Sequence, residues 1–589
     1  MLHLTLQAKL QTAVRAVLPD AETAAVLVRP CPDARHGDYQ SNALIALAKQ
    51  RKLNPRQLAE QVKAALAVGD LCDAVDIAGP GFLNFRVKPA ALGGLLLAEA
   101  AKDQPFVPKA EQPRTVVIDF SSPNVAKPMH VGHIRSTGIG DALQRVFRLL
   151  GHNVITDNHI GDWGTQFGKL LLGWKQILDR DALAREPIAE LERLYKVINA
   201  ECDANPARLE EAKQELVKLQ AGDAENIAVW QEMIRVSQRQ FDSVYGRLGV
   251  KFDHTLGESF YNPQLGAVVA DLLARGIARE SEGAVGVFSD GSLPPKSDPF
   301  LVNRDGEWVA DPALVRKSDG GFNYMTTDLA TIDYRLRTWS PDEIVYVVDD
   351  RQAPHFRKLF LTFARWQPAA AARVKLNHVG FGKILGDDGK PFKTRSGDTV
   401  KLEDLLDEAE ERALKVVTEK NPDLPAAERK EIARIVGLGA VKYADLLPNR
   451  QSDYQFNWEK MLALQGNTAP YLQYAYTRVR SIFRRGGESS AVSGQPSAIS
   501  LNAPDELALA KHLMNFGLAL EAVAEECRPN FLCNYLYELA GLFARFYESC
   551  PVLKAEGTER ATRLLLCDLT GRVLKQGLAA LGIEVTEQM

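Results

Sequence analysis

The sequence lacks the features that mark membrane, zinc-binding and disulfide-stabilised proteins. Its longest nearly apolar run, residues 90–98, contains two glycines and is far too short to span a membrane. Its seven cysteines include no C-x-x-C pair, so their spacing predicts neither a zinc site nor a disulfide framework. We therefore expect a cytoplasmic protein with buried, reduced cysteines, no membrane partner and no structural metal held by protein ligands.

An excess of charge of one sign is also absent. Lysine and arginine number 71, aspartate and glutamate number 75, and the formal net charge is −4. This balance excludes a protein coated with positive charge for nonspecific nucleic-acid binding, while a local basic surface remains compatible with it. With 46% hydrophobic and 25% charged residues, the composition is typical of a globular protein.

The length of 589 residues is enough for about three to five domains. Helical patterns followed by two short strands around a Gly-Pro-Gly turn predict an α+β domain over residues 1–110. The apolar run at 115–120 is typical of a strand buried on both faces of a parallel sheet. The loop, helix and strand after it complete a β-α-β unit, which predicts a Rossmann-like domain over residues 111–385. A charged helical and β module interrupts this domain at about 170–320.

The rest of the chain has mainly helical patterns. A glycine-rich, cationic loop opens a helical region over residues 386–465, and an all-α domain is predicted over 466–589. Its amphipathic patterns lie near 505–526, 530–549 and 558–580. The predicted fold class is therefore multidomain α/β, with a parallel-sheet core, helical insertions, an α+β N-terminal domain and an all-α C-terminal domain.

The most informative segment is Ser121–His133, which reads Ser-Ser-Pro-Asn-Val-Ala-Lys-Pro-Met-His-Val-Gly-His. His130 and His133 follow a predicted buried strand and begin a predicted helix, where free backbone N–H groups favour a polyphosphate. Gly132 leaves room for a nucleotide to approach the backbone. The pattern H-x-G-H is expected about 0.01 times by chance in this composition. A phosphate site is therefore favoured over two ordinary surface histidines.

A second segment, residues 386–397, is rich in glycine and positive charge. Its side chains Lys390, Lys393 and Arg395 would close over a pyrophosphate leaving group, where negative charge develops. A charged loop of this kind is more often simply solvated, so the segment gains meaning only together with the histidine motif.

These two segments resemble the signatures of class I aminoacyl-tRNA synthetases, and the first resembles the arginyl-tRNA synthetase form. Gly-Asp-Trp-Gly at 161–164, Tyr-Met-Thr-Thr-Asp at 324–328 and Gly-Lys-Pro-Phe-Lys-Thr-Arg at 389–395 carry the same resemblance. The segment at 79–85 resembles the additional N-terminal domain of that family, and the helical C-terminus resembles its anticodon-binding domain. The resemblance is therefore close to full length.

The resemblance implies an enzyme that uses ATP to attach L-arginine to its cognate tRNA through an arginyl-adenylate, releasing AMP and pyrophosphate. It implies ATP with Mg²⁺, L-arginine and tRNA as substrates, and a monomer. It also assigns roles to the domains. Residues 1–110 would contact tRNA, 111–385 would carry catalysis, 386–465 the second signature and stem contacts, and 466–589 the anticodon contacts.

The second signature departs from the family pattern. Relatives have Lys-Met-Ser-Lys-Ser, whereas residues 392–396 read Phe-Lys-Thr-Arg-Ser. The resemblance implies that a lysine just before the histidines, Lys127, compensates; a solvated loop lysine is an equally good interpretation. Which cation meets the pyrophosphate stays open. The catalytic candidates are His130, His133, Lys393 and Lys127, and the ATP-binding candidates are His130, Gly132, His133, Lys393 and Arg395.

An arginine-selective site needs a carboxylate for the guanidinium, and an aromatic ring suits its planar face. Tyr324 and Asp328, four residues apart on a predicted helix, offer both from one face. Glu280 or Glu282 would be a second acid, although a solvated turn is the better interpretation of either. By resemblance, the amino-acid site is lined by Asp119, Ser122, Asn124, His133, Tyr324, Asp328 and Gln352.

Aromatic and basic residues interleave over 471–485, a composition suited to stacking on unpaired bases and binding phosphates. Tyr471, Arg478 and Arg484 are the tRNA-binding candidates there. A buried helix stripe accounts equally well for some of the neighbouring tyrosines. In the N-terminal domain, Asn84 and Arg86 are candidates for tRNA contact by resemblance alone.

Several other functions are compatible with parts of the same sequence. Glutaminyl, glutamyl and cysteinyl synthetases are the nearest, and the cysteinyl form is disfavoured because no zinc-like Cys/His cluster is present. A catalytically inactive tRNA-binding relative should have lost the phosphate histidines or the pocket acids, yet this chain keeps them. A small H-x-G-H nucleotidyltransferase conflicts with the length and with the separate helical C-terminus.

Overall fold

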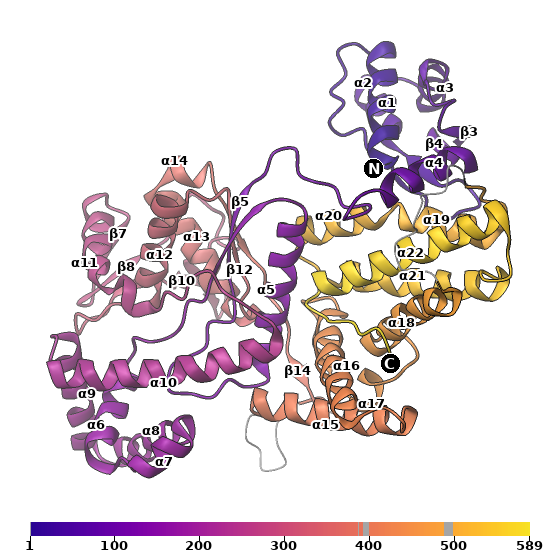
Figure 1. The fold of residues 1–589 in the computed structure, drawn as a ribbon. Coiled ribbons are helices and arrows are strands. Elements are labelled where there is room, and N and C mark those ends of the chain that lie inside the picture. Colours follow the sequence, from indigo (N-terminus) through magenta and orange to yellow (C-terminus); the bar gives the residue numbers. More distant parts are fainter. Residues whose placement is uncertain (1, 387, 391, 393–399, 488–498) are drawn as a thin grey trace.

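The computed structural model describes residues 2–386, 388–390, 392, 400–487 and 499–589. The N-terminal unit is an antiparallel sheet of order β1-β2-β4-β3 packed with helices, which confirms the predicted α+β architecture (Figure 1). The Gly-Pro-Gly turn joins β3 to β4, as predicted. The elements are α1 (Leu2–Val17), β1 (Arg29–Pro30), β2 (Tyr39–Ser41), α2 (Ala43–Arg51), α3 (Pro55–Ala65), β3 (Cys72–Ala78), β4 (Phe82–Val87) and α4 (Pro89–Ala100).

The central domain contains a parallel sheet of order β13-β12-β5-β6, which confirms the Rossmann-like prediction. Val116 and Ile118 of β5 pack into one hydrophobic core, and Val117 between them packs into another. The continuous apolar run therefore reflects a strand covered on both faces. The elements are β5 (Thr115–Asp119), α5 (Gly132–Leu149), β6 (Asn153–Asp157), α11 (Glu258–Ala274), α12 (Tyr324–Trp339), β12 (Glu343–Tyr346), η1 (Asp350–Gln352), α13 (Ala353–Trp366), α14 (Pro368–Ala371) and β13 (Lys375–His378).

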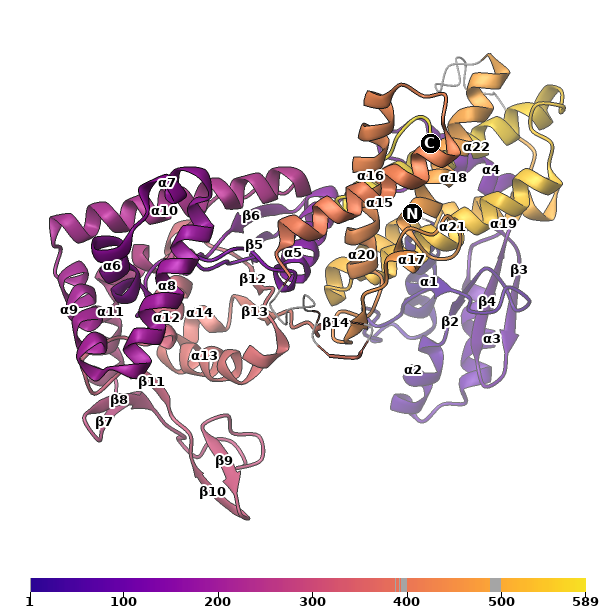
Figure 2. The same ribbon diagram turned by 90° about the horizontal axis from the view of Figure 1, so that it is seen from below.

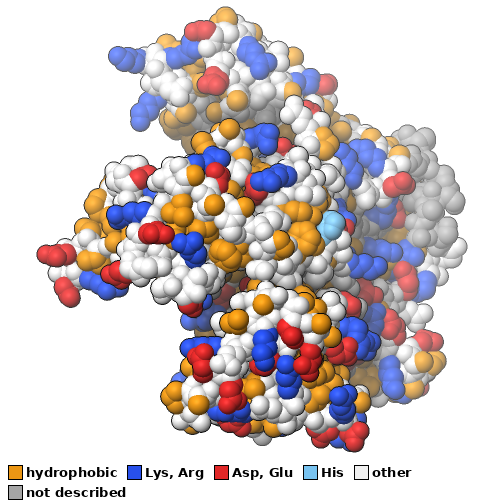
Figure 3. Space-filling view, turned by 90° about the vertical axis from the view of Figure 1, so that its left-hand side faces the viewer, with side chains coloured by type: hydrophobic (Ala, Val, Ile, Leu, Met, Phe, Trp, Pro, Cys, Tyr) orange, Lys and Arg blue, Asp and Glu red, His pale blue; other side chains and the backbone are white. Residues whose placement is uncertain are grey.

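Two insertions extend from this sheet. A helical one lies between β6 and α11, and a small β module follows α11, with a hairpin of β9 and β10 projecting from the body (Figure 2). The helices are α6 (Gln166–Ile177), α7 (Arg180–Arg185), α8 (Pro187–Ala204), α9 (Pro206–Gln220) and α10 (Ala224–Leu248). The strands are β7 (Ala278–Ser281), β8 (Ala284–Val287), β9 (Leu301–Arg304), β10 (Glu307–Ala310) and β11 (Ala313–Arg316). On the face shown in Figure 3, basic and acidic side chains are interspersed.

The C-terminal part is helical, as predicted, apart from a short pairing of β14 with β15. Residues 505–526 were expected to form one helix, but they form two, because the helix is interrupted between Leu513 and Phe516. The elements are β14 (Ile384–Leu385), α15 (Leu402–Lys420), α16 (Ala426–Leu446), β15 (Tyr454–Gln455), α17 (Trp458–Met461), α18 (Ala469–Gly486), α19 (Pro504–Leu513), α20 (Phe516–Glu526), α21 (Asn530–Ser549) and α22 (Gly557–Ala580).

One stretch among the described residues, Pro504–Glu526, is long and apolar enough to cross a membrane by composition alone. Half of its most apolar window is buried inside the protein, and a core helix passes the same test.

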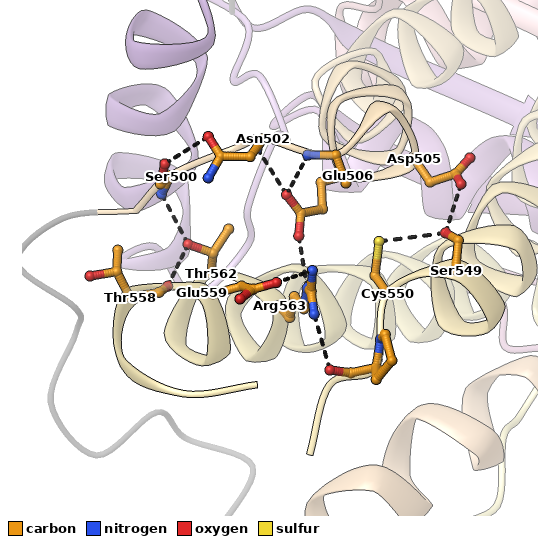
Figure 4. Close-up of polar contacts among 12 residues, drawn as sticks. Ser500, Asn502, Asp505, Glu506, Ser549, Cys550, Thr558, Glu559, Thr562 and Arg563 are labelled. Carbon is orange, nitrogen blue, oxygen red and sulfur yellow. Dashed lines mark hydrogen bonds and ion pairs between the residues drawn. The ribbon is translucent and has the colours of Figure 1, made fainter. Parts of the chain in front are cut away.

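A polar clamp fixes the start of α19 against α22 (Figure 4). The Glu506 carboxylate accepts the backbone N–H groups of Asn502 and Ala503, each at 3.0 Å, and the Nε of Arg563 at 2.8 Å. Arg563 also donates to the carbonyl of Pro551. The capping carboxylate satisfies N–H groups at the start of the helix that have no intrahelical partner, so the start of α19 is tied to the C-terminal bundle.

A buried ion pair joins the central domain to the helical C-terminal part. Arg135 on α5 and Asp445 on α16 have side chains only 1% exposed, with 3.1 Å between Nε and Oδ1. Arg135 also lies over the ring of Tyr454 and donates to the carbonyl of Ser452. Because α5 begins at the histidine motif, this pair fixes the helix that carries the motif relative to α16.

All seven cysteines lie in the described part of the chain and none is paired. Six are buried and Cys31 is half-buried.

Candidate active site

The loop between β5 and α5 has an unusual backbone. Ser121, Ser122 and Ala126 have φ angles of 72°, 48° and 62°, in the left-handed region that costs non-glycine residues energy. Side chains from distant segments hold this conformation. Ser136 and Asn158 accept the N–H groups of Ser121 and Ser122, and the hydroxyl of Ser237 accepts that of Ala126. The loop is therefore a rigid platform for Asn124, Lys127 and the histidines.

The two histidines differ in how their Nδ1 atoms are bonded. The backbone N–H of Gly132 donates to Nδ1 of His130 at 3.1 Å. A ring nitrogen that accepts a hydrogen bond carries no proton, so neutral His130 keeps its proton on Nε2. Nδ1 of His133 lies 3.0 Å from the backbone nitrogen of His130 and 3.2 Å from its carbonyl oxygen, so it has both a donor and an acceptor beside it. The ring centroids are 4.0 Å apart, and the motif thus presents the Nε2–H donor of His130 beside a second imidazole.

Both imidazoles are neutral near pH 7. Burial lowers the pKa of His133 to about 3, and the charge of His130 adds to this effect. Burial, then Arg351 and Lys127, also lower the pKa of His130. The histidines therefore serve as dipolar hydrogen-bond donors, and positive charge must come from other side chains.

Position 132 requires glycine for a steric reason, in addition to the predicted approach of a nucleotide. A Cβ there would lie 2.9 Å from Cε1 of His130. A side chain would therefore displace the imidazole whose Nδ1 the same glycine holds.

A cavity of about 560 Å³ lies beside the histidines. Lys127 projects toward it from the rigid loop, with its ammonium 5.1 Å from the ring centroid of Tyr195 on α8. Lys393 and Arg395 lie outside the described residues. The cavity is lined by Asn124, Ala126, Lys127, Pro128, His130, His133, Glu192, Tyr195, Lys196 and Lys401.

Tyr324 and Asp328 lie together at the start of α12, joined by a residue that the sequence did not single out. Oδ2 of Asp328 lies 2.6 Å from Nε2 of His355, and the ring of Tyr324 packs edge-on against the same imidazole at 4.7 Å. Tyr324 is 58% exposed. Gln352 is exposed at the end of η1, just before α13, which carries His355. This group is the best-formed part of the predicted arginine site.

Asp119 and Ser122 already have partners within the chain. Oδ2 of Asp119 lies 2.6 Å from Arg335, a fully buried arginine that also contacts Asp157 at 2.8 Å. The hydroxyl of Ser122 donates to the other oxygen of Asp119 at 3.1 Å. The pKa of Arg335 is raised well above its usual range by these two carboxylates. Asp119 therefore anchors α12 to the sheet, whatever further contact it makes.

The Gly-Asp-Trp-Gly segment packs against the same loop. The carbonyl of Gly161 accepts the N–H of Val125 at 3.0 Å, and a Cβ on Gly161 would lie 2.2 Å from Oδ1 of Asn124. Asp162 accepts both the N–H and the hydroxyl of Ser259. The motif is therefore structural support for the loop and for the start of α11.

Glu258, at the first position of α11, is an acid that the sequence did not single out. Burial raises its pKa to about 7; the charges of Asp162 and Asp328 add to the rise, whereas His159 opposes it. Its proximity to Asp328 makes it a better second acid than Glu280, which is exposed and pairs with Arg316, or Glu282, which is exposed in a turn.

Among the tRNA candidates, Arg478 and Arg484 line one groove of about 450 Å³ on α18, next to Tyr547 and Met589. The guanidinium of Arg478 lies 4.5 Å from the ring centroid of Tyr547. Tyr471 is half-buried against Tyr537 and is not part of that lining. Tyr476, a neighbouring tyrosine on the same helix, is buried in the core, as expected for a buried helix stripe.

The two N-terminal tRNA candidates differ in exposure. The Asn84 side chain is buried, whereas Arg86 is exposed and lies 3.6 Å from Asp76. Arg86 also donates to the carbonyl of Arg35. Of these two residues, only Arg86 has a side chain that is accessible for contact with tRNA.

Three family models match the chain. The one described as "tRNA synthetases class I (R), catalytic domain" matches residues 96–458. "Arginyl tRNA synthetase N terminal domain" matches 4–87 and "DALR anticodon binding domain" matches 472–589. An arginine–tRNA ligase of Chromobacterium violaceum is 46% identical over the whole of both chains. The chain belongs to the arginyl-tRNA synthetase family.

Further relatives agree with this assignment. The arginine–tRNA ligase of Azotobacter vinelandii is 48% identical, covering 97% of this chain and 96% of the relative. The structure of Thermus thermophilus arginyl-tRNA synthetase superposes with a TM-score of 0.83 at 26% identity, and that of the Plasmodium falciparum enzyme with 0.81 at 27%. The Thermus match covers 100% of both chains, and the Plasmodium match covers 100% of this chain and 99% of that one.

As an arginyl-tRNA synthetase, the protein is a class I ligase that aminoacylates tRNA with arginine and uses ATP as a substrate. The glutaminyl, glutamyl, cysteinyl and nucleotidyltransferase alternatives are therefore set aside. Within the described ranges, no group of three or more His, Cys, Asp or Glu residues is arranged to hold a metal ion.

Proposed function

We propose that the ligase reaction is carried out by two neighbouring groups of side chains around the β5–α5 loop. The arginine carboxylate attacks the α-phosphorus of ATP and pyrophosphate leaves. The terminal 2′-hydroxyl of tRNA then takes the arginyl group from the adenylate, releasing AMP. His130 and His133 donate ring N–H groups to phosphate oxygens, and the Nε2–H of His130, fixed by the hydrogen bond that its Nδ1 accepts from Gly132, is the observation that carries this assignment. Arginine-dependent ATP–pyrophosphate exchange, run with and without tRNA, tests the first half-reaction.

Charge on the phosphates is neutralised by lysines. Lys127 faces the cavity from a rigid loop, and Lys393 and Arg395 of the second signature are proposed to act on the same phosphates. Mg²⁺ accompanies ATP, since its preferred ligands are phosphate oxygens and water. These cations stabilise the negative charge that grows on the departing pyrophosphate.

The arginine substrate is proposed to bind between α12 and the β5–α5 loop. Asp328, oriented by its contact with His355, faces the guanidinium, and Tyr324 packs on its planar face. Gln352, Asn124, Ser122, Asp119 and His133 complete the site around the ammonium and carboxylate ends. Selectivity for arginine then depends on the paired charge at Asp328.

Asp328→Asn is expected to reduce discrimination against citrulline about 10–150-fold. The substitution keeps the shape of the side chain but removes the charge of a hydrogen bond worth about 1.5–3 kcal/mol. Relative kcat/KM for arginine and citrulline in the exchange reaction measures the effect. Asp333→Asn, on the same helix but paired with Arg337, is the matched control. Unchanged selectivity with a lowered melting temperature would limit Asp328 to a structural role.

Glu258 is proposed to be the second acid of the arginine site, and pH tests this. With a pKa of about 7, the carboxyl is largely protonated at pH 6 and ionised at pH 8. A bound guanidinium favours the ionised form, so KM for arginine should rise as pH falls below 7, by up to about tenfold per unit. Glu258→Gln should remove this dependence. A parallel pH profile in the variant would show that the pH effect does not come from Glu258.

For tRNA, we propose contacts by Arg86 and Asn84 in the N-terminal unit and by Tyr471, Arg478 and Arg484 along α18. Their support is the exposure of Arg86 and the basic, aromatic-lined groove on α18. The proposed domain limits are 1–110, 111–385, 386–465 and 466–589, and the matched family models, which cover 4–87, 96–458 and 472–589, support the division into N-terminal, catalytic and anticodon-binding parts.

We also propose that the enzyme acts as a cytoplasmic monomer. The unpaired cysteines are typical of a reducing compartment, and the monomeric state is the one that the family resemblance implies.

A further inference from the structure

The first signature segment is hydrogen-bonded to the segment that follows the second. The N–H of Val131 donates to the carbonyl of Val400, and the N–H of Leu402 donates to that of Met129, both at 2.9 Å. His130 and Lys401 lie opposite each other in this short antiparallel bridge. Two residues that are 271 positions apart are thus fixed side by side by backbone bonds alone.

This register determines where the side chain of Lys401 lies. Opposite residues of an antiparallel pair extend to the same side, with Cβ atoms about 4.5–5.5 Å apart. In agreement, Lys401 and His130 both line the cavity of about 560 Å³, together with Lys127. Lys401 therefore faces the space assigned above to phosphates, and it is held there without any contribution from its own side chain.

The ammonium of Lys401 differs from the other lysines of the cavity. Lys127 packs on the Tyr195 ring, and Lys196 pairs with Glu192 at 2.7 Å. In the described part of the chain, no hydrogen-bond or ion-pair partner is found for Lys401, which is exposed. Its charge is available to an incoming anion.

We propose that Lys401 contacts the pyrophosphate end of ATP as a further cation of the phosphate site, in the cavity that Lys127 also lines. The proposal rests on the phosphate role of His130 and His133 proposed above. Lys401 forms no covalent bond. Its charge opposes the negative charge that passes to pyrophosphate as the bond to the α-phosphorus breaks. This assigns a function to a lysine outside both signatures, in a chain whose second signature departs from the family pattern.

The test uses the full-length enzyme with arginine, ATP, tRNA and labelled pyrophosphate. Lys401→Met is expected to raise KM for pyrophosphate and to lower kcat of the exchange, each about tenfold, with an unchanged melting temperature. Lys401→Arg keeps the charge and should restore most of both. Lys415→Met is the matched control, because Lys415 lies on α15, the helix that Lys401 precedes, and pairs with Glu411 at 2.9 Å.

His133→Ala, measured in parallel, separates this proposal from the one it rests on. If His133→Ala abolishes exchange while Lys401→Met leaves KM for pyrophosphate unchanged, the role of Lys401 is overturned and the histidine site stands. If His133→Ala retains full exchange, the phosphate site itself is misplaced. A lower melting temperature in Lys401→Met with no recovery of KM in Lys401→Arg would also overturn the proposal, since it would mark a structural role.

Discussion

His133→Ala should lower arginine-dependent ATP–pyrophosphate exchange about 100–1,000-fold, and His130→Ala should do the same. Each variant removes one preorganised donor to a phosphate that gains charge in the transition state, and such losses have this magnitude. His133→Gln places an amide N–H near the position of Nε2 and should recover part of the rate.

The neutral state of both rings sharpens this prediction. Because burial lowers the pKa of His133 to about 3, its donor does not titrate between pH 6 and 8. The loss in His133→Ala should therefore be the same across that range. His36→Ala, in an exposed loop of the N-terminal unit, is the control. Near-parental exchange in both motif variants would contradict the phosphate assignment.

Asp445→Ala is expected to lower the free energy of unfolding by about 3–5 kcal/mol, because it leaves Arg135 buried without its partner. Both side chains are 1% exposed, so water cannot replace the lost carboxylate. Burial raises the pKa of Asp445, and the charge of Arg135 opposes this rise. Each charged side chain therefore stabilises the other in the buried site. Urea unfolding of the full chain, followed by fluorescence and by residual exchange activity, measures the loss.

Two controls belong with this measurement. Glu408→Ala breaks an exposed pair with Arg412 on α15 and should cost about 0.5 kcal/mol or less. The double change Arg135→Met with Asp445→Leu removes both charges and should be more stable than Asp445→Ala alone. If the double variant is no better than the single one, the cost lies in packing rather than in the unpaired charge.

Local patterns predicted the parts of the fold in which neighbouring residues decide the structure. The apolar run at 115–120 predicted a strand covered on both faces, and α5 begins at Gly132 inside the histidine motif. The single pattern at 505–526 did not show the break between α19 and α20, because both halves have apolar residues on a compatible face. A change of helix direction depends on what the two halves pack against.

In the candidate site, contacts between distant segments are even harder to predict from local sequence patterns. Tyr324 and Asp328 were found because a spacing of four residues puts both on one helix face. His355 and Glu258 were missed because each reaches the site from a separate element, and no local pattern marks either. The partner of Asp119, Arg335, is 216 positions away. Contacts of this kind follow from how the sheet and α12 pack, which periodicity does not encode.

The distribution of cysteines gives the protein a low background for single-site chemical labelling. Six thiols are buried, and burial raises the pKa of Cys72 and of Cys527 to about 11, so little reactive thiolate is present near neutral pH. Replacing half-buried Cys31 with serine would leave an enzyme that reacts very little with thiol-reactive dyes. A cysteine introduced at exposed Glu307, on the projecting β9–β10 hairpin, would then carry one fluorophore far from the histidine motif and report how that hairpin responds when tRNA arrives.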